Sequence, residues 1–93
     1  MIKSFGDKEC REFFITGKSK KIVSTIQKVA LRKLDYINSA ICLDDLKVPP
    51  ANHLEKLNGD LEGFYSIRIN KQYRVIFRFE EQDAFDVKIV DYH

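Results

Sequence analysis

The stretch Phe64–Val90, FYSIRINKQYRVIFRFEEQDAFDVKIV, decides the fold. Within it, apolar residues recur at every second position in three runs, which predicts β-strands over residues 64–69, 73–79 and 85–90. The segments between these runs, Asn70–Gln72 and Glu81–Asp83, are short and polar. Connections this tight join antiparallel neighbours, so the sequence predicts an antiparallel meander.

Two helices are predicted before the meander. Asp7 can cap a helix that runs through Thr16, and Gly17 is a typical stop. A second, longer helix is expected to open at Lys18 or Ser19 and to fade near residue 38. Its apolar positions recur at three- and four-residue spacing and form one stripe: Ile22, Ile26, Val29, Ala30, Leu34 and Ile37.

The remaining segments complete the expected architecture. Ile2–Phe5 is a short strand candidate, and Leu43–Leu46 suggests one further helical turn. Pro49-Pro50 forces a loop, and Asn52–Asp60 has no clear period. The predicted fold class is α+β in the order β-α-α-β-β-β. Two N-terminal helices pack on one face of a mainly antiparallel four-stranded sheet, and residues 1–93 form a single domain.

The composition is typical of a globular domain. It is 44% hydrophobic and 32% charged, and no segment approaches the ~20 apolar residues that a membrane span needs. No apolar run follows Met1, so no secretory signal is expected. Cys10 and Cys42 have no metal-type spacing and are expected to be reduced, although a disulfide remains an alternative.

Charge is unevenly distributed along the chain. Residues 1–42 hold nine Lys or Arg against four Asp or Glu, whereas residues 43–93 hold seven against ten. No acidic residue lies between Gly17 and Leu34, where Lys20, Lys21 and Lys28 fall. Such a segment attracts polyanions or an acidic protein, although a solvated helix face balanced elsewhere explains it equally well.

A basic sheet face is also predicted. Strand alternation directs the apolar residues toward the helices and leaves four cations on the opposite face: Arg68, Arg74, Arg78 and Lys88. Like charges on neighbouring strands repel, so this cluster needs an anion, acidic side chains or solvent. Arginine fits phosphate oxygens bidentately. The alternative is pairing with Glu62, Glu80 or Asp86 in surface salt bridges.

The last predicted strand leads into Asp91-Tyr92-His93, three side chains that handle protons. Histidine both accepts and donates protons near neutral pH, although a solvated spectator is the simpler explanation. Ideal alternation would separate Tyr92 from its two neighbours, so a bulge or stronger twist is expected in this strand. The two histidines lack metal-binding spacing, and no cofactor motif is present, so neither a metal nor a cofactor is expected.

Several of these motifs together match a known family. They are Ile2–Phe5, the Gly-Asp-x-x-Gly pattern within Leu57–Gly63, Tyr73–Phe77 with Arg74, and the closing Asp91–His93. On these residues the chain resembles HigB-type toxins, most closely the GraT-like branch, of the RelE/ParE superfamily of bacterial toxin–antitoxin modules. The resemblance covers nearly the whole chain.

The resemblance implies a RelE-like microbial RNase fold and a function. The implied activity is a metal-independent endoribonuclease that cleaves mRNA in the ribosomal A site and so inhibits translation and growth. It implies a HigA-like helix-turn-helix antitoxin as partner, with operator DNA contacted only through that antitoxin. It also implies a protein of the bacterial cytoplasm, with no membrane partner.

The resemblance also assigns site residues. Asp91, Tyr92 and His93 match the family's catalytic tail, and Arg74 matches its strand arginine. Some members carry a histidine four residues before the Gly-Asp turn, where this chain has Glu55, with His53 two residues away. Three alternatives follow from this difference: Glu55 serves as a base, the activity is weaker, or His53 reaches in from the loop. The candidate catalytic residues are Glu55, Arg74 and the tail. RNA phosphates would be held by Arg68, Arg78, Lys88, Lys20, Lys21 and Lys28.

The expected chemistry is attack of a ribose 2′-OH on its own phosphodiester, which needs a base, an acid and cations for the phosphorane. Histidine and glutamate would share the acid and base roles in an order left open. A different class of function remains as the alternative: a non-catalytic inhibitor that docks on a protein such as gyrase, as ParE relatives do. The same fold hosts both classes.

Overall fold

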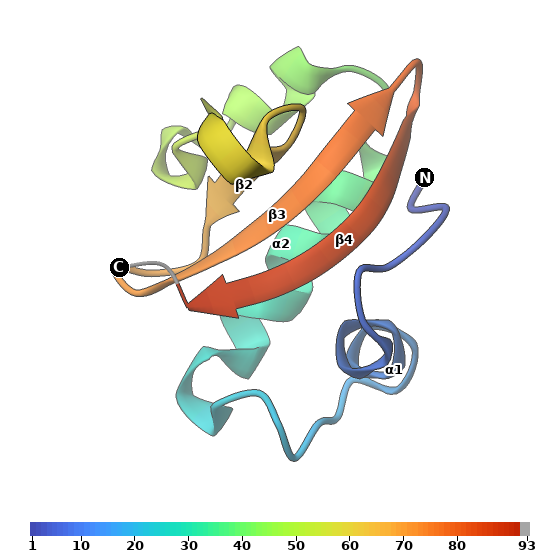
Figure 1. The fold of residues 1–93 in the computed structure, drawn as a ribbon. Helices are drawn as coiled ribbons and strands as arrows, with labels where there is room; N and C mark the ends of the chain where they lie inside the picture. Colours follow the sequence, from blue (N-terminus) through green and yellow to red (C-terminus); the bar gives the residue numbers. More distant parts are fainter. Residues whose placement is uncertain (92–93) are drawn as a thin grey trace.

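Two α-helices, four short 3₁₀ helices and a four-stranded antiparallel sheet make up the described part of the chain. The computed structural model describes residues 1–91, and the strands lie in the order β1-β2-β3-β4. Figure 1 shows α2 behind the sheet and α1 beside β4. The predicted α+β class is confirmed. The elements are α1 (Lys8–Thr16), α2 (Gln27–Ser39), β1 (Glu55–Lys56), β2 (Tyr65–Arg68), β3 (Tyr73–Glu80) and β4 (Asp83–Asp91).

The first helix has the predicted bounds because both of its ends are capped. The Asp7 carboxylate accepts a hydrogen bond from the Cys10 backbone N–H at 2.8 Å. At the other end Gly17 takes a left-handed conformation with φ 75°, and its N–H donates to the Phe13 carbonyl. These caps satisfy backbone groups that a helix end otherwise leaves unpaired.

The second helix begins later than predicted. α2 starts at Gln27 after a 3₁₀ turn at Ser24–Ile26, and does not start at Lys18 or Ser19. The Ser19 hydroxyl accepts hydrogen bonds from the N–H groups of Lys21 and Ile22. Serine that bonds nearby backbone in this way offers the chain an alternative to the helix. Lys20 and Lys21 therefore lie in a loop.

The N-terminal segment and the predicted irregular region differ from expectation in detail. Ile2–Phe5 forms only isolated parallel bridges, to Ala84 and Val87 of β4. The Ile2 backbone N–H donates a hydrogen bond to the Oδ1 atom of the Asn38 side chain. The fourth strand of the sheet is instead β1, which pairs with β2. None of the helices formed by residues 1–91 is long and apolar enough to cross a membrane.

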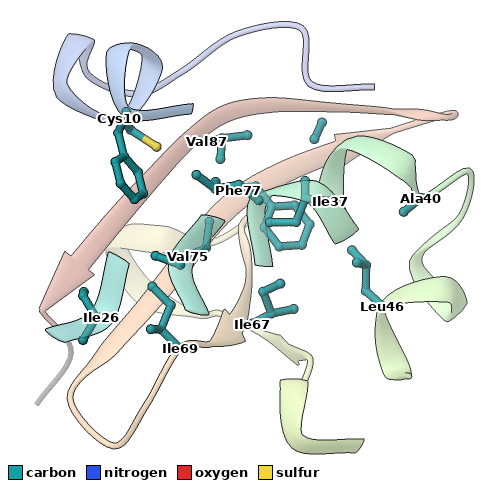
Figure 2. Close-up of a cluster of buried hydrophobic side chains, with 14 residues drawn as sticks. Cys10, Ile26, Ile37, Ala40, Leu46, Ile67, Ile69, Val75, Phe77 and Val87 are labelled. Atoms are coloured by element: carbon teal, nitrogen blue, oxygen red, sulfur yellow. The ribbon is translucent and has the colours of Figure 1, made fainter. Parts of the chain in front are cut away.

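The core lies between α2 and the adjoining face of the sheet. Val75 and Phe77 of β3 are fully buried, as are Leu34 and Ile37 of α2. Figure 2 shows Phe77 beside Ile37, with Val75 and Ile67 in the same cluster. Burial of each large apolar side chain contributes roughly 1.5–3 kcal/mol. This packing fixes which face of β3 is turned away from the helices.

A β-bulge interrupts the pairing of β3 with β4. Ile76 lies opposite Lys88, whereas Arg78 lies opposite Phe85, so β4 has one extra residue between these pairs. Asp86 lies there with φ 54°, in the left-handed region. The expected irregularity in this strand is present, but it falls at the middle of β4 and not beside Asp91. A bulge of this kind re-aims the side chains that follow it.

The buried thiol of Cys10 gives a prediction about alkaline stability. Burial, aided by the Asp7 charge, raises its pKa from 9.0 to about 12. Between these values the folded state holds a proton that the unfolded chain has lost, so stability falls as pH rises. We expect unfolding by urea to show a free-energy loss on the order of 3 kcal/mol between about pH 8 and pH 11 that Cys10→Ala removes.

Cys42→Ala is the matched control, because Cys42 is a free and exposed cysteine. Comparison of the two variants with the parent cancels the titration of all other groups. An equal change of the pH dependence in both variants would show that burial of Cys10 is not its cause.

Candidate active site

Arg74 lies on the sheet face away from α2, where several contacts hold its side chain. It lies directly opposite Arg68 of β2 and Val90 of β4. Its guanidinium contacts the Glu55 carboxylate at 2.9 Å and donates to the Ser66 hydroxyl at 3.1 Å. A further, longer hydrogen bond of 3.5 Å reaches the His53 carbonyl. The side chain is only 14% exposed, so its orientation is fixed before any ligand arrives.

Neighbouring strands bring these partners together. Glu55 of β1 lies opposite Ser66 of β2, and Ser66 lies opposite Ile76 of β3. Ser66 is fully buried, whereas the Glu55 side chain is 49% exposed. The site therefore combines a fixed cation with a carboxylate that solvent or a substrate can reach. Ser66 was not among the predicted site residues, although a small polar residue within an apolar strand is a signal of such a role.

The loop before β1 is anchored by Asn52. This fully buried side chain accepts a hydrogen bond from the Lys33 Nζ at 2.6 Å and donates to the Leu46 carbonyl at 3.1 Å. His53 follows with φ 45°, a conformation that non-glycine residues adopt at a cost. Its carbonyl faces the Arg74 guanidinium. At the position of the family histidine, Glu55 pairs directly with Arg74, and His53 contributes backbone.

The other predicted cations of this face have different surroundings. Arg68 is half-buried, and its Nε donates to the Asn70 carbonyl at 3.1 Å. Arg78 contacts Asp86 at 2.9 Å and Glu80 at 3.7 Å, so the expected salt-bridge alternative is confirmed for this residue. Lys88 is exposed opposite Ile76. The basic face thus contains two kinds of cation. Arg74 and Arg78 are paired with acidic side chains, whereas Arg68 and Lys88 form no ion pair within residues 1–91.

The predicted lysines lie elsewhere. Lys20 and Lys21 line a cavity of 540 Å³ between α1 and the following loop, together with Glu9 and Glu12. Lys28 belongs to α2, in the layer behind the sheet (Figure 1). The structure does not bring these three lysines to Arg74.

The predicted catalytic tail is described only at its first residue. Asp91 lies opposite Tyr73, and its carboxylate accepts a hydrogen bond from the Gln72 side chain at 3.0 Å. Tyr92 and His93 lie outside the described residues. Among residues 1–91, no group of three or more His, Cys, Asp and Glu side chains is arranged to hold a metal ion.

Comparison with known proteins identifies related sequences. Residues 3–93 match a family model described as "RelE-like toxin of type II toxin-antitoxin system HigB". The chain is 40% identical over 87 residues to "Toxin HigB-1" of Vibrio cholerae serotype O1, covering 92% of each chain. It is 30% identical over 93 residues to "Endoribonuclease HigB" of Proteus vulgaris, covering all of both chains.

Solved structures with the same fold have far lower sequence identity. A chain of the YoeB–YefM toxin–antitoxin complex from Staphylococcus aureus superposes with a TM-score of 0.64 at 19% identity, covering 100% of this chain and 95% of that one. YafQ from E. coli strain BL21(DE3) gives 0.60 at 13% identity, covering 98% and 91%. At such identities the likeness shows the fold.

The buried Asn52 gives a prediction about the support of the site. Asn52→Ala leaves the Lys33 ammonium and the Leu46 carbonyl without this partner, and unpaired buried polar groups cost about 1–3 kcal/mol, more for charged groups. We expect unfolding by urea to show a loss of about 3 kcal/mol. Asn58→Ala, at an exposed position, is the matched control. Equal stability of the two variants would contradict an anchoring role.

Proposed function

The chain belongs to the HigB-like family of RelE-like toxins of type II toxin–antitoxin systems, and from this we propose that it is an endoribonuclease that cleaves mRNA in the ribosomal A site. Cleavage there would stop translation and growth. The name of the Proteus vulgaris relative supports the enzymatic activity, and the geometry around Arg74 supports its site.

The observation that carries this proposal is the restrained Arg74 guanidinium beside Glu55. Glu55, Ser66 and the His53 carbonyl hold the cation in one orientation. A phosphodiester that reaches this face would meet a preorganised charge, which stabilises a phosphorane more than the less charged ground state. Arg68, directly across the strand pair, would supply a second cation to the bound RNA backbone.

The proposed reaction needs no reactant other than RNA. The ribose 2′-oxygen forms a bond to the adjacent phosphorus while the bond to the 5′-oxygen of the next nucleotide breaks. A base takes the 2′-OH proton, and an acid gives a proton to the departing 5′-oxygen. Glu55 and His93 share these two roles in our proposal, while Tyr92 and Asp91 orient the groups that transfer protons.

We propose that the reaction is independent of metal ions and cofactors. RNA supplies its own nucleophile, which DNA lacks. The negative charge that grows on the phosphorane would be compensated by Arg74, a role that metal ions fill in other phosphoryl-transfer enzymes. Arg78, Lys88 and the lysines at positions 20, 21 and 28 would contact RNA outside the cleavage point.

A HigA-like helix-turn-helix antitoxin is the proposed partner, and operator DNA would be contacted only through it. The family description, which places the chain in a type II toxin–antitoxin system, supports an antitoxin partner. The related fold in the YoeB–YefM complex supports binding of an antitoxin to this type of scaffold. The cytoplasm, where ribosomes and mRNA meet, is the proposed location.

Substitutions at the ion pair test the cleavage site. Arg74→Ala should lower kcat about 100-fold or more, because one fixed charge on the phosphorane is lost. Glu55→Gln keeps the shape and a hydrogen-bond acceptor for Arg74 but not the carboxylate base, and should cost roughly 10²–10⁴-fold. The measurement is mapping of mRNA 5′ ends in growing cells, with cleavage rates in a purified translation system.

The controls for these variants are Arg11→Ala on α1 and Asp35→Asn on α2. Both residues are exposed, and these substitutions change the net charge by the same amounts as Arg74→Ala and Glu55→Gln. The control variants should cleave at the parent rate. Toxicity that survives both Arg74→Ala and His93→Ala without new codon-phased ends would overturn the nuclease proposal in favour of docking on a protein target.

The lysines outside the site give a separate prediction. Replacing Lys20, Lys21 and Lys28 with glutamine should weaken RNA binding and make its salt dependence shallower, with a slope change of about 0.7 for each phosphate that is no longer neutralised. The measurement is the affinity for a single-stranded RNA over a range of salt concentrations. A variant with glutamine at Lys3, Arg11 and Lys47 makes the same change in net charge. If both variants change the slope equally, the effect comes from net charge alone.

A further inference from the structure

A second cavity adjoins the Arg74 site at the edge of the sheet. It has a volume of 320 Å³ and lies between α2, the loop before β1 and the end of β2. Small-ligand sites begin at about this size. Its lining residues are Val29, Arg32, Lys33, Ala51, His53, Arg68 and Ile69.

The charged residues that line this cavity are all basic. They are Arg32, Lys33 and Arg68, and no aspartate or glutamate of residues 1–91 joins them. By contrast, the cavity beside α1 contains Glu9 and Glu12 among its lysines. Within the described part of the chain, no carboxylate forms an ion pair with any of the three cations. Three cations gathered in this way repel one another until an anion enters.

The surroundings of Lys33 also favour an anion in this cavity. Lys33 is 5% exposed, and its ammonium contacts the Asn52 amide oxygen and lies 5.6 Å from the centre of the Tyr36 ring. Burial lowers its pKa, and the positive charge of Arg32 lowers it further. An anion in the cavity would offset both causes, because it favours the charged form of the amine.

Two residues connect the cavity to the Arg74 site. His53 lines the cavity, while its carbonyl accepts a hydrogen bond from Arg74. Arg68 lines the cavity and lies directly opposite Arg74 on the neighbouring strand. Directly opposed residues of antiparallel strands have their Cα atoms about 4.5–5.5 Å apart and share one face. A strand of RNA bound at Arg74 would therefore pass close to the cavity.

We propose that this cavity is a phosphate subsite for the RNA strand, in which Arg32, Lys33 and Arg68 hold a backbone phosphate next to the one that is cleaved. This inference rests on the proposed nuclease function. The guanidinium of Arg68 donates one hydrogen bond through its Nε, to Asn70, and its terminal nitrogens can donate to a phosphate. Val29 and Ile69 provide apolar surface for the attached nucleoside.

The test uses Arg32→Gln and Arg68→Gln with an uncleavable single-stranded oligodeoxynucleotide as the probe. Each variant should bind more weakly, and the salt dependence of log affinity should become shallower by about 0.7 for each phosphate released. In cleavage assays Arg32→Gln should raise KM several-fold and leave kcat unchanged, as expected when binding away from the reacting bond is weakened. Thermal unfolding checks that both variants fold.

Arg11→Gln is the matched control, because it removes an exposed arginine from α1. If Arg32→Gln and Arg68→Gln bind the probe with the affinity and salt dependence of Arg11→Gln, the subsite is overturned. Failure of the nuclease proposal gives a different result: the parent protein would then not cleave RNA at all.

The source of the phosphate is tested separately with inorganic phosphate. NMR signals of the Arg32 and Arg68 side chains should shift on addition of the oligodeoxynucleotide at concentrations where inorganic phosphate has no effect. If inorganic phosphate shifts them at the lower concentration, the cavity is a site for free phosphate and the assignment to RNA fails.

Discussion

The structure depends on the alternation of β3, whose two faces have opposite requirements. Val75 and Phe77 are fully buried on the side of α2, so Arg74 and Arg78 must lie on the other side. A shift of register by one residue would exchange these faces and bury the guanidinium groups against the helix. The apolar core therefore places the cations of the candidate site from the opposite side of the same strand.

The cations still repel one another, and the fold reduces this repulsion in two ways. Arg74 is matched by Glu55, which β1 supplies from the edge of the sheet. Arg78 is matched by Asp86, which lies at the bulge of β4. The extra residue also allows Val87 to be buried in the core, although Phe85, two residues earlier, lies opposite Arg78 on the other face. The bulge in β4 thus allows both the burial of Val87 in the core and the ion pair between Arg78 and Asp86 on the other face.

Sequence patterns predicted the elements whose structure is determined locally. The caps at Asp7 and Gly17 fixed α1, and alternation located β2, β3 and β4. The start of α2 escaped prediction because the Ser19 hydroxyl bonds the backbone in place of a helical turn. β1 escaped because two exposed residues carry no apolar period, so only pairing with β2 defines the strand.

The candidate site was also predicted only in part, because some of its residues are determined by local sequence and others by distant contacts. Arg74 and Arg68 follow from alternation, and Glu55 followed from its position in the family pattern. The buried Ser66 and the carbonyl of His53 did not, because their roles depend on contacts between segments that are distant in sequence.

The structure also separates the arginines by their surroundings. An arginine paired with a neighbouring carboxylate is held in a fixed orientation, whereas an arginine without such a partner attracts an anion more strongly. Arg74 belongs to the first kind, and within residues 1–91 Arg32 and Arg68 belong to the second. A polyanionic substrate needs both kinds of arginine. The arginines without a carboxylate partner attract the substrate along its length, and this attraction brings the substrate to Arg74, the charge whose position must be fixed.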